Sequence, residues 1–173
     1  MDLLFDTETA MSHPSPTHYH RVQIALHWVI FLLFAFNFVV SEGMGKALRL
    51  KLEGGIPEGL VPLLHPPVGV AVLVLTLIRI VARVRLGAPD LPENGKPLMD
   101  KAAHWAHLAL YALLVLIPLS GMAAWGGGIK AAGDVHEILV KITMITVVLH
   151  AVAAVFHQFV LKDNLLSRMR PGG

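Results

Sequence analysis

The chain has 173 residues, of which 55% are hydrophobic and 15% charged, and its mean hydropathy is +0.64. An average soluble domain is not this apolar, so much of the surface is expected to face lipid. The sequence contains no cysteine, which excludes disulfides, thiolate-bound zinc and iron–sulfur clusters. The net charge is only +2, without a basic stripe with interleaved aromatic residues, so nucleic acid is not an expected partner.

Four long apolar segments predict an all-α integral membrane protein built as a four-helix bundle. Each segment runs for about 20 residues with almost no charge, the length at which a helix crosses a hydrocarbon core of roughly 30 Å. Residues 1–19 are polar and predict a flexible tail, which leaves residues 20–173 as the transmembrane domain. The expected spans cover residues 22–41, 63–83, 102–125 and 136–161.

Lysine and arginine are distributed unevenly between the two sides of these spans. One side, which carries both termini and the second loop, has nine such residues: Arg21, Arg79, Arg83, Arg85, Lys96, Lys101, Lys162, Arg168 and Arg170. The opposite side has four: Lys46, Arg49, Lys51 and Lys130. Because loops rich in Lys and Arg stay in the cytoplasm, both termini are predicted to be cytoplasmic.

Seven of the ten histidines fall within the predicted spans or at their ends. They are His27, His65, His104, His107, His136, His150 and His157. Ionisable groups are costly inside a membrane and usually mark a functional site. The alternative for any one of them is a hydrogen bond to a neighbouring helix that only supports packing.

The fourth span carries two histidines on nearly the same face. His136 and His150 are 14 residues apart, which is about 21 Å along a helix. Counting residues from the span ends places His65 at the depth of His136, and His27 at that of His150. Two imidazoles from different helices at each of two depths suit the two axial positions of a low-spin haem b, so two haem b sites are predicted.

The third span offers a rival to His27 and a possible quinone site. His107 lies at a similar depth to His27 and ranks second as the partner of His150. His104, His107 and Tyr111 follow one another at helical spacing along one stripe. This stripe would line a haem edge or a quinone pocket, or it would simply pack polar residues between helices.

Several further residues support a cofactor site, each with a simpler alternative. Pro66 and Pro67 are expected at a helix start, and Gly69 would let a flat ring approach the backbone. Arg21 would pair with a haem propionate or serve only as a topology signal. Glu137 would orient a ligand, accept a proton or cap a helix.

The sequence resembles the bacterial cytochrome b561 family from His20 onward. The first motifs are His20-Arg21-Val22-Gln23-Ile24-Ala25-Leu26-His27-Trp28 and the His-x-x-x-Gly of residues 65–69. The third span carries Ala103-His104-Trp105-Ala106-His107 and Ile117-Pro118-Leu119-Ser120-Gly121. The fourth carries His136-Glu137, Leu149-His150-Ala151 and His157-Gln158-Phe159-Val160-Leu161-Lys162-Asp163-Asn164.

The resemblance implies haem b iron ligated by His27, His65, His136 and His150 in a multi-pass protein of the bacterial inner membrane. It also implies electron exchange with ubiquinone, for which Tyr111, His157 and Gln158 are candidate site residues. Some similar proteins are superoxide oxidases, so a superoxide:quinone oxidoreductase is one expected activity, with Lys130 or Lys141 steering the anion. The connection at 126–135 is shorter than in members with larger loops, which puts a substrate site on that loop in doubt.

Two other functions are considered. In the second hypothesis, the chain would act as a membrane anchor and electron conduit for a partner protein, a periplasmic dehydrogenase or hydrogenase, with the same two haems. A histidine-rich transporter of divalent metals is the third reading. Transport of such cations usually recruits carboxylates at mid-membrane depth, whereas the acidic residues here lie in tails, loops or span edges.

Overall fold

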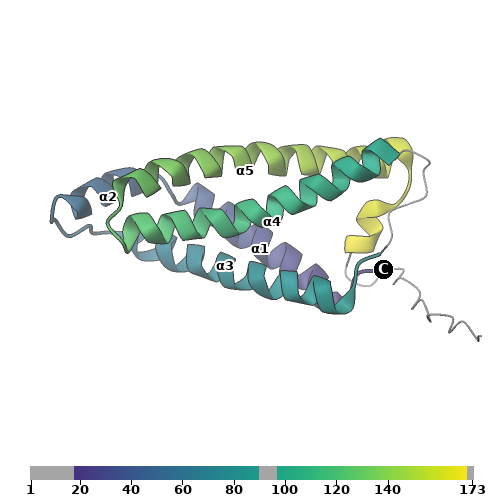
Figure 1. The fold of residues 1–173 in the computed structure, drawn as a ribbon, viewed down its shortest axis with the longest axis horizontal. Coiled ribbons are helices and arrows are strands. Elements are labelled where there is room, and N and C mark those ends of the chain that lie inside the picture. The colour runs from purple at the N-terminus through teal and green to yellow at the C-terminus, as the bar shows by residue number, and fades with distance from the viewer. Residues whose placement is uncertain (1–17, 90–96, 171–173) are drawn as a thin grey trace, which may run out of the picture.

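The structure is a computed structural model that describes residues 18–89 and 97–170, and within these ranges every regular element is a helix or a helical turn. Figure 1 shows the long helices side by side, with α2 at one end of the bundle and the C-terminal segment at the other. Most of the predicted N-terminal tail lies outside the described residues. The elements are α1 (Arg21–Val39), α2 (Met44–Leu52), α3 (Leu60–Leu86), α4 (Pro97–Trp125), α5 (Lys130–Phe156), a π-helical turn η1 (His157–Leu161) and a 3-10 turn η2 (Leu165–Met169).

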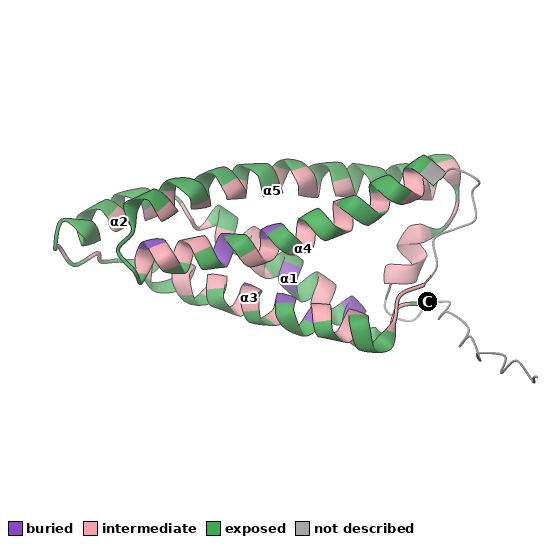
Figure 2. Cartoon of the chain, in the orientation of Figure 1, coloured by how far each residue is buried: buried purple, intermediate pink, exposed green. Residues whose placement is uncertain are grey.

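Four helices are long and apolar enough to cross a membrane, which confirms the predicted class of fold. The candidate spans are Arg21–Val39, Leu60–Leu86, Leu98–Trp125 and Lys130–Leu161. Only 6–22% of the residues in their apolar windows are buried inside the protein. Many of the remaining apolar side chains lie on the exposed helix surfaces seen in Figure 2, and lipid is the environment that suits them.

Three helices begin clearly earlier than the sequence pattern predicts, among them α4, which begins at Pro97. α3 begins at Leu60, so Pro66 and Pro67 lie in its second turn and not at its start. α5 begins at Lys130, six residues before His136. At α5, the early residues Lys130, Gly133 and Asp134 hide the helix start from a search for charge-free runs. His65 lies five residues after the start of α3 and His136 six residues after the start of α5, so the two histidines stay at matching depths.

The short helix α2 was not predicted. It follows Gly43, whose backbone is in the left-handed region with φ 89°, and it packs against α3. Its sequence combines Lys46, Arg49 and Lys51 with apolar residues, so it carries no long hydrophobic run that would reveal it. α2 covers the end of the bundle opposite the start of α1 and the turn η2.

The long helices pack in a chain of neighbours. α1 contacts α3, α3 contacts α4, and the contact between α4 and α5 is the most extensive. α5 has no comparable contact with either α1 or α3. The bundle therefore keeps α5 apart from the two helices that carry His27 and His65.

Candidate functional site

The first site, defined here as His65 on α3 and His136 on α5, lies at the α2 end. Their ring centroids are 6.1 Å apart and their planes make an angle of 75°. A metal bound by both imidazoles needs two bonds of roughly 2 Å each in addition to the distance from each nitrogen to its ring centre. The observed separation is of that size, so the structure brings together the two histidines that residue counting pairs, and their role as ligands stays a prediction.

The His136 imidazole is held in one orientation by the neighbouring helix α4. Its Nδ1 donates to the backbone carbonyl of Ile117 at 2.8 Å and lies 3.3 Å from the hydroxyl of Ser120. That hydroxyl donates to the same carbonyl at 2.8 Å. Since a carbonyl can only accept, the proton sits on Nδ1 and the Nε2 lone pair is free. This is the arrangement by which proteins prepare a histidine as a metal ligand.

Gly121 allows that hydrogen bond. It lies one helical turn after Ile117, on the same face of α4, and a Cβ built there would stand 3.1 Å from Cε1 and 3.2 Å from Nδ1 of His136. Such contacts are tighter than a side chain normally accepts, so any other residue would push the imidazole away from the carbonyl. The motif that ends in Ser120-Gly121 thus positions a histidine on another helix.

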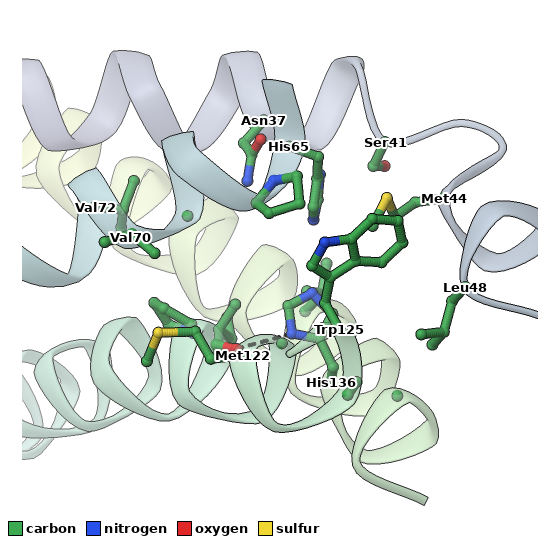
Figure 3. A pocket seen from close by; sticks show the side chains of 18 of the residues that line it. Asn37, Ser41, Met44, Leu48, His65, Val70, Val72, Met122, Trp125 and His136 are labelled. Carbon is green, nitrogen blue, oxygen red and sulfur yellow. Dashed lines mark hydrogen bonds between the residues drawn. The ribbon is translucent and has the colours of Figure 1, made fainter. Parts of the chain in front are cut away.

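A cavity of about 650 Å³ opens between the two imidazoles of the first site. Its size falls in the range of cofactor pockets, roughly 300–1,000 Å³. Figure 3 shows His65 and His136 in its wall together with Asn37 and Trp125. Most of the wall is apolar, whereas Nδ1 of His65 and Oδ1 of Asn37 are buried without a hydrogen-bond partner in the described residues. The cavity combines an apolar lining with a few polar atoms that a ligand would meet.

The second site comprises His27 on α1, His107 on α4 and His150 on α5. The rings of His107 and His150 are 5.4 Å apart at 73°. His27 is half-buried and interacts electrostatically with both of them. Within residues 18–89 and 97–170, no three His, Asp or Glu side chains gather closely enough to hold one metal ion, so the histidines meet as pairs.

Helix packing and ring distance favour different ligand pairs at the second site, which are His107 with His150 and His27 with His150. His107 and His150 lie on α4 and α5, the two helices with the most extensive contact, which disfavours a large planar group between them. His27 and His150 lie on α1 and α5, which are held apart. The ring distance favours the first pair and the available space favours the second, so the choice of His27 stays a prediction.

Four other predicted residues are placed by the structure, and their roles stay predictions. Gly69 lines the first cavity, and a Cβ there would meet only Nδ2 of Asn37 at 3.8 Å. His157 bonds through Nδ1 to the carboxylate of Asp163. Tyr111 is half-buried on α4, one turn from His107. Arg21 is exposed at the start of α1.

Glu137 pairs with Lys141 at 2.7 Å on an exposed part of α5, at the rim of the first cavity. The capping alternative for Glu137 is wrong, because α5 begins two turns earlier, at Lys130. The ion pair also partly neutralises Lys141, one of the two lysines predicted to attract an anion. Lys130 lies exposed in the first turn of α5.

Two groups of residues escaped the sequence reasoning. Met44 and Leu48 of α2 line the first cavity, and Lys51 of α2 places its Nζ 4.5 Å from the centre of the Trp125 ring. Arg79, counted above as a loop cation, lies inside α3 and is only 9% exposed. For Arg79, the one signal in the sequence was a charged residue directly after an uninterrupted apolar run.

The fold and the paired imidazoles define a class: a four-helix membrane protein built to hold a metal-centred cofactor between histidines on different helices. The family model for prokaryotic cytochrome b561 matches residues 18–172. The chain belongs to this family of membrane haem b electron-transfer proteins, which makes it a multi-pass protein of the bacterial inner membrane.

Similar proteins have nearly the same length. A protein of Cereibacter sphaeroides named cytochrome b562 is 46% identical over 151 residues, which cover 87% of this chain and 94% of the relative. A probable superoxide oxidase, CybB, of Yersinia pestis is 29% identical over 88% of this chain and 96% of the relative. Cytochrome b561 homolog 1 of Escherichia coli is also 29% identical, over 88% of this chain and 97% of the relative.

The residues of the first site fit the haem b that the family implies. The cavity is apolar and large enough, His136 presents a free Nε2, and the buried Nδ1 of His65 has no partner in the described part of the chain. At the second site, the half-buried imidazoles provide the same kind of nitrogen ligand. Neither site offers a thiolate or a carboxylate in the ligand position.

Proposed function

We propose that the chain binds two haem b groups and carries electrons across the inner membrane to ubiquinone. The first haem would be ligated by His65 and His136 and the second by His27 and His150. With both termini in the cytoplasm, the first site faces the periplasm and the second the cytoplasm. Superoxide is the proposed electron donor, which would make the protein a superoxide:quinone oxidoreductase.

The observation that carries this proposal is the stacking of two histidine sites along α5. His136 and His150 are 14 residues apart, about 21 Å along the helix, and each meets a histidine from another helix. Thr143 lies midway between them and is fully buried, with its hydroxyl bonded to Leu139. A single helix thus links two cofactor sites at different depths of the membrane.

His27 is proposed as the second-site ligand because of the space around it. A haem is wider than the gap between two closely packed helices, and α4 and α5 are such a pair. α1 and α5 are separated, and the resemblance to the family selects the same histidine. His107 would then lie beside the haem as a third imidazole, where it can donate or accept a hydrogen bond.

The chemistry needed at the periplasmic end is the capture of a small anion. Haem b, when bound, supplies an iron that accepts and releases one electron. Superoxide gives up one electron and leaves as dioxygen, so two superoxide ions provide the two electrons that ubiquinone needs. The exposed cations Lys46, Arg49 and Lys51 on α2 flank the first cavity, and they would raise the local concentration of the anion.

The chemistry needed at the cytoplasmic end is delivery of two protons, because ubiquinone becomes ubiquinol only when two protons accompany two electrons. His157 and Asp163 share a hydrogen bond, and we propose that these two residues deliver the protons. The side chains of these residues are only 18% and 6% exposed, so the pair is sheltered from bulk water. The π-helical turn η1 places His157 out of the regular α5 ladder, and such turns are frequent at functional sites.

The test begins with a pyridine haemochrome count and a reduced-minus-oxidised spectrum of the purified protein. Two haem b per chain with a low-spin α band are expected. The protein alone should then reduce a ubiquinone analogue when superoxide is generated, with one quinol formed for each two superoxide ions. Two haems without this activity, together with a dehydrogenase that co-purifies and reduces them, would instead establish an electron-conduit subunit. A chain without haem would refute the proposal.

A further inference from the structure

A buried arginine lies beside the second site. Arg79 is on α3 and 9% exposed, and its guanidinium donates to the backbone carbonyl of Gln23 in the first turn of α1. An arginine inside a membrane is costly and normally faces a partner of opposite charge. Among residues 18–89 and 97–170, no carboxylate lies within ion-pairing distance of Arg79. The protein therefore buries a positive charge that its own described residues leave without a counter-ion.

Arg79 lies at the depth of the second site. It is 14 residues after His65 on α3, as His150 is 14 residues after His136 on α5. Both helices run away from the α2 end, and the first two histidines face each other, so the equal spacing brings Arg79 level with His150. The charge of Arg79 interacts with the imidazoles of His27, His107 and His150. Among the described residues, no cation is a cause of the electrostatic effects on His65 of the first pair.

Hydrogen bonds between α1 and α3 hold the Arg79 guanidinium in place. The side-chain amide of Gln23 donates to the carbonyls of Ala82 at 3.2 Å and Gly87 at 2.9 Å, which lie in the last turn and at the end of α3. Gln23 itself is only 2% exposed. The backbone of Gln23 thus binds the Arg79 guanidinium, and the side chain of Gln23 binds the end of α3, the helix that carries Arg79. These bonds tie the positions of Gln23 and Arg79 to each other. A fixed charge in a low dielectric acts strongly on its neighbours.

We propose that Arg79 raises the reduction potential of the second-site haem and thereby directs electrons from the first site to the second. Reduction adds a negative charge at the iron, which a fixed cation nearby stabilises. The same cation would pair with a propionate of that haem, which removes an opposing negative charge and acts in the same direction. This inference rests on the proposed function, because it requires a haem at each site.

The test is a potentiometric titration of the two-haem protein and of Arg79→Gln, with His136→Ala used to identify the signal of the second site. Arg79→Gln should lower the second-site potential and leave the first unchanged. The equilibrium constant for sharing one electron between the haems should shift at least tenfold toward the first site, which corresponds to about 59 mV. Arg79→Lys keeps the charge and should shift the constant less than threefold.

Arg85→Gln is the matched control, because Arg85 is exposed near the end of the same helix. It should leave both potentials unchanged. An unchanged constant in an Arg79→Gln protein that holds two haems would overturn the inference and leave the proposed function intact. If Arg79→Gln loses its second haem, Arg79→Lys decides, and loss of that haem from the lysine variant as well would also overturn it. A wild-type protein with fewer than two haems would refute the proposed function itself.

Discussion

The imidazole of His136 lies against the backbone of Gly121, so close that an added Cβ would stand 3.1 Å from its Cε1. This contact explains how a small-residue motif on α4 sets the orientation of a histidine that belongs to α5. The absence of a side chain at position 121 lets Nδ1 of His136 reach the carbonyl of Ile117 and leaves Nε2 for a metal.

Gly121→Ala should therefore damage the first site specifically. The methyl group must displace an imidazole that a hydrogen bond fixes and that the proposed haem iron would fix further, and such overpacking typically costs about 1–3 kcal/mol. The expected result is a lower haem content or a shifted first-site potential, with the second site unchanged. Leu119→Ala, at an outward-facing position on the same helix, serves as the control. A wild-type spectrum and potential in Gly121→Ala would contradict this account.

Gly69→Ala should behave differently, because its Cβ would meet only ordinary contact with Asn37. In the haem-free protein, thermal unfolding should be unchanged. In the loaded protein, the methyl group would occupy part of the cavity and speed haem loss to an acceptor such as apomyoglobin. Equal rates of haem loss for this variant and the wild type would show that the planar group does not lie against Gly69.

Removing single histidines should reduce the haem count from two to one per chain. His136→Ala and His65→Ala should each lose the first haem alone, since the two sites share only α5. His27→Ala should lose the second haem, whereas His107→Ala should keep it with an altered spectrum. The pyridine haemochrome ratio measures each outcome. Full loss of the second haem from His107→Ala, with retention in His27→Ala, would transfer the ligand role to His107.

Asp163→Asn should slow the reduction of quinone without changing the haem content. The amide keeps the shape of the side chain but cannot exchange a proton with the His157 imidazole, and loss of a proton-transfer group typically costs about 100-fold or more in rate. Stopped-flow measurement of quinol formation checks this. His104→Ala, which removes an exposed histidine of α4, should leave the rate unchanged. If Asp163→Asn retains the wild-type rate, the proton-delivery role is wrong.

Lys51→Gln should weaken the capture of superoxide at the α2 end. Lys51 is exposed and lies over Trp125, which lines the first cavity, so its charge acts on an approaching anion. The bimolecular rate at low ionic strength should fall on the order of threefold, and the difference should vanish near 1 M salt, where the Debye length is about 3 Å. Lys101→Gln at the opposite end is the control. A deficit that persists at high salt would indicate a packing effect instead of steering.

The sequence by itself determined the class of fold and the spacing along each helix. Four apolar runs predict four spans because hydrocarbon accepts only helices with satisfied backbones. The 14-residue interval between His136 and His150 predicts two levels of ligand because helix rise is constant. The pairing of His65 with His136 follows from the same arithmetic, and it is found in the structure.

Only the tertiary structure decided which residues meet across helices. Residue counting cannot fix the rotation of a helix, so it could not show Arg79 inside the bundle, His107 beside His150, or Gly121 against His136. It also could not find α2, whose role depends on folding back over a cavity between α3 and α5. The depth of a residue in the membrane follows from its position along its own helix, which the sequence gives directly. The direction in which its side chain faces and the distance between helices depend on how whole helices pack together.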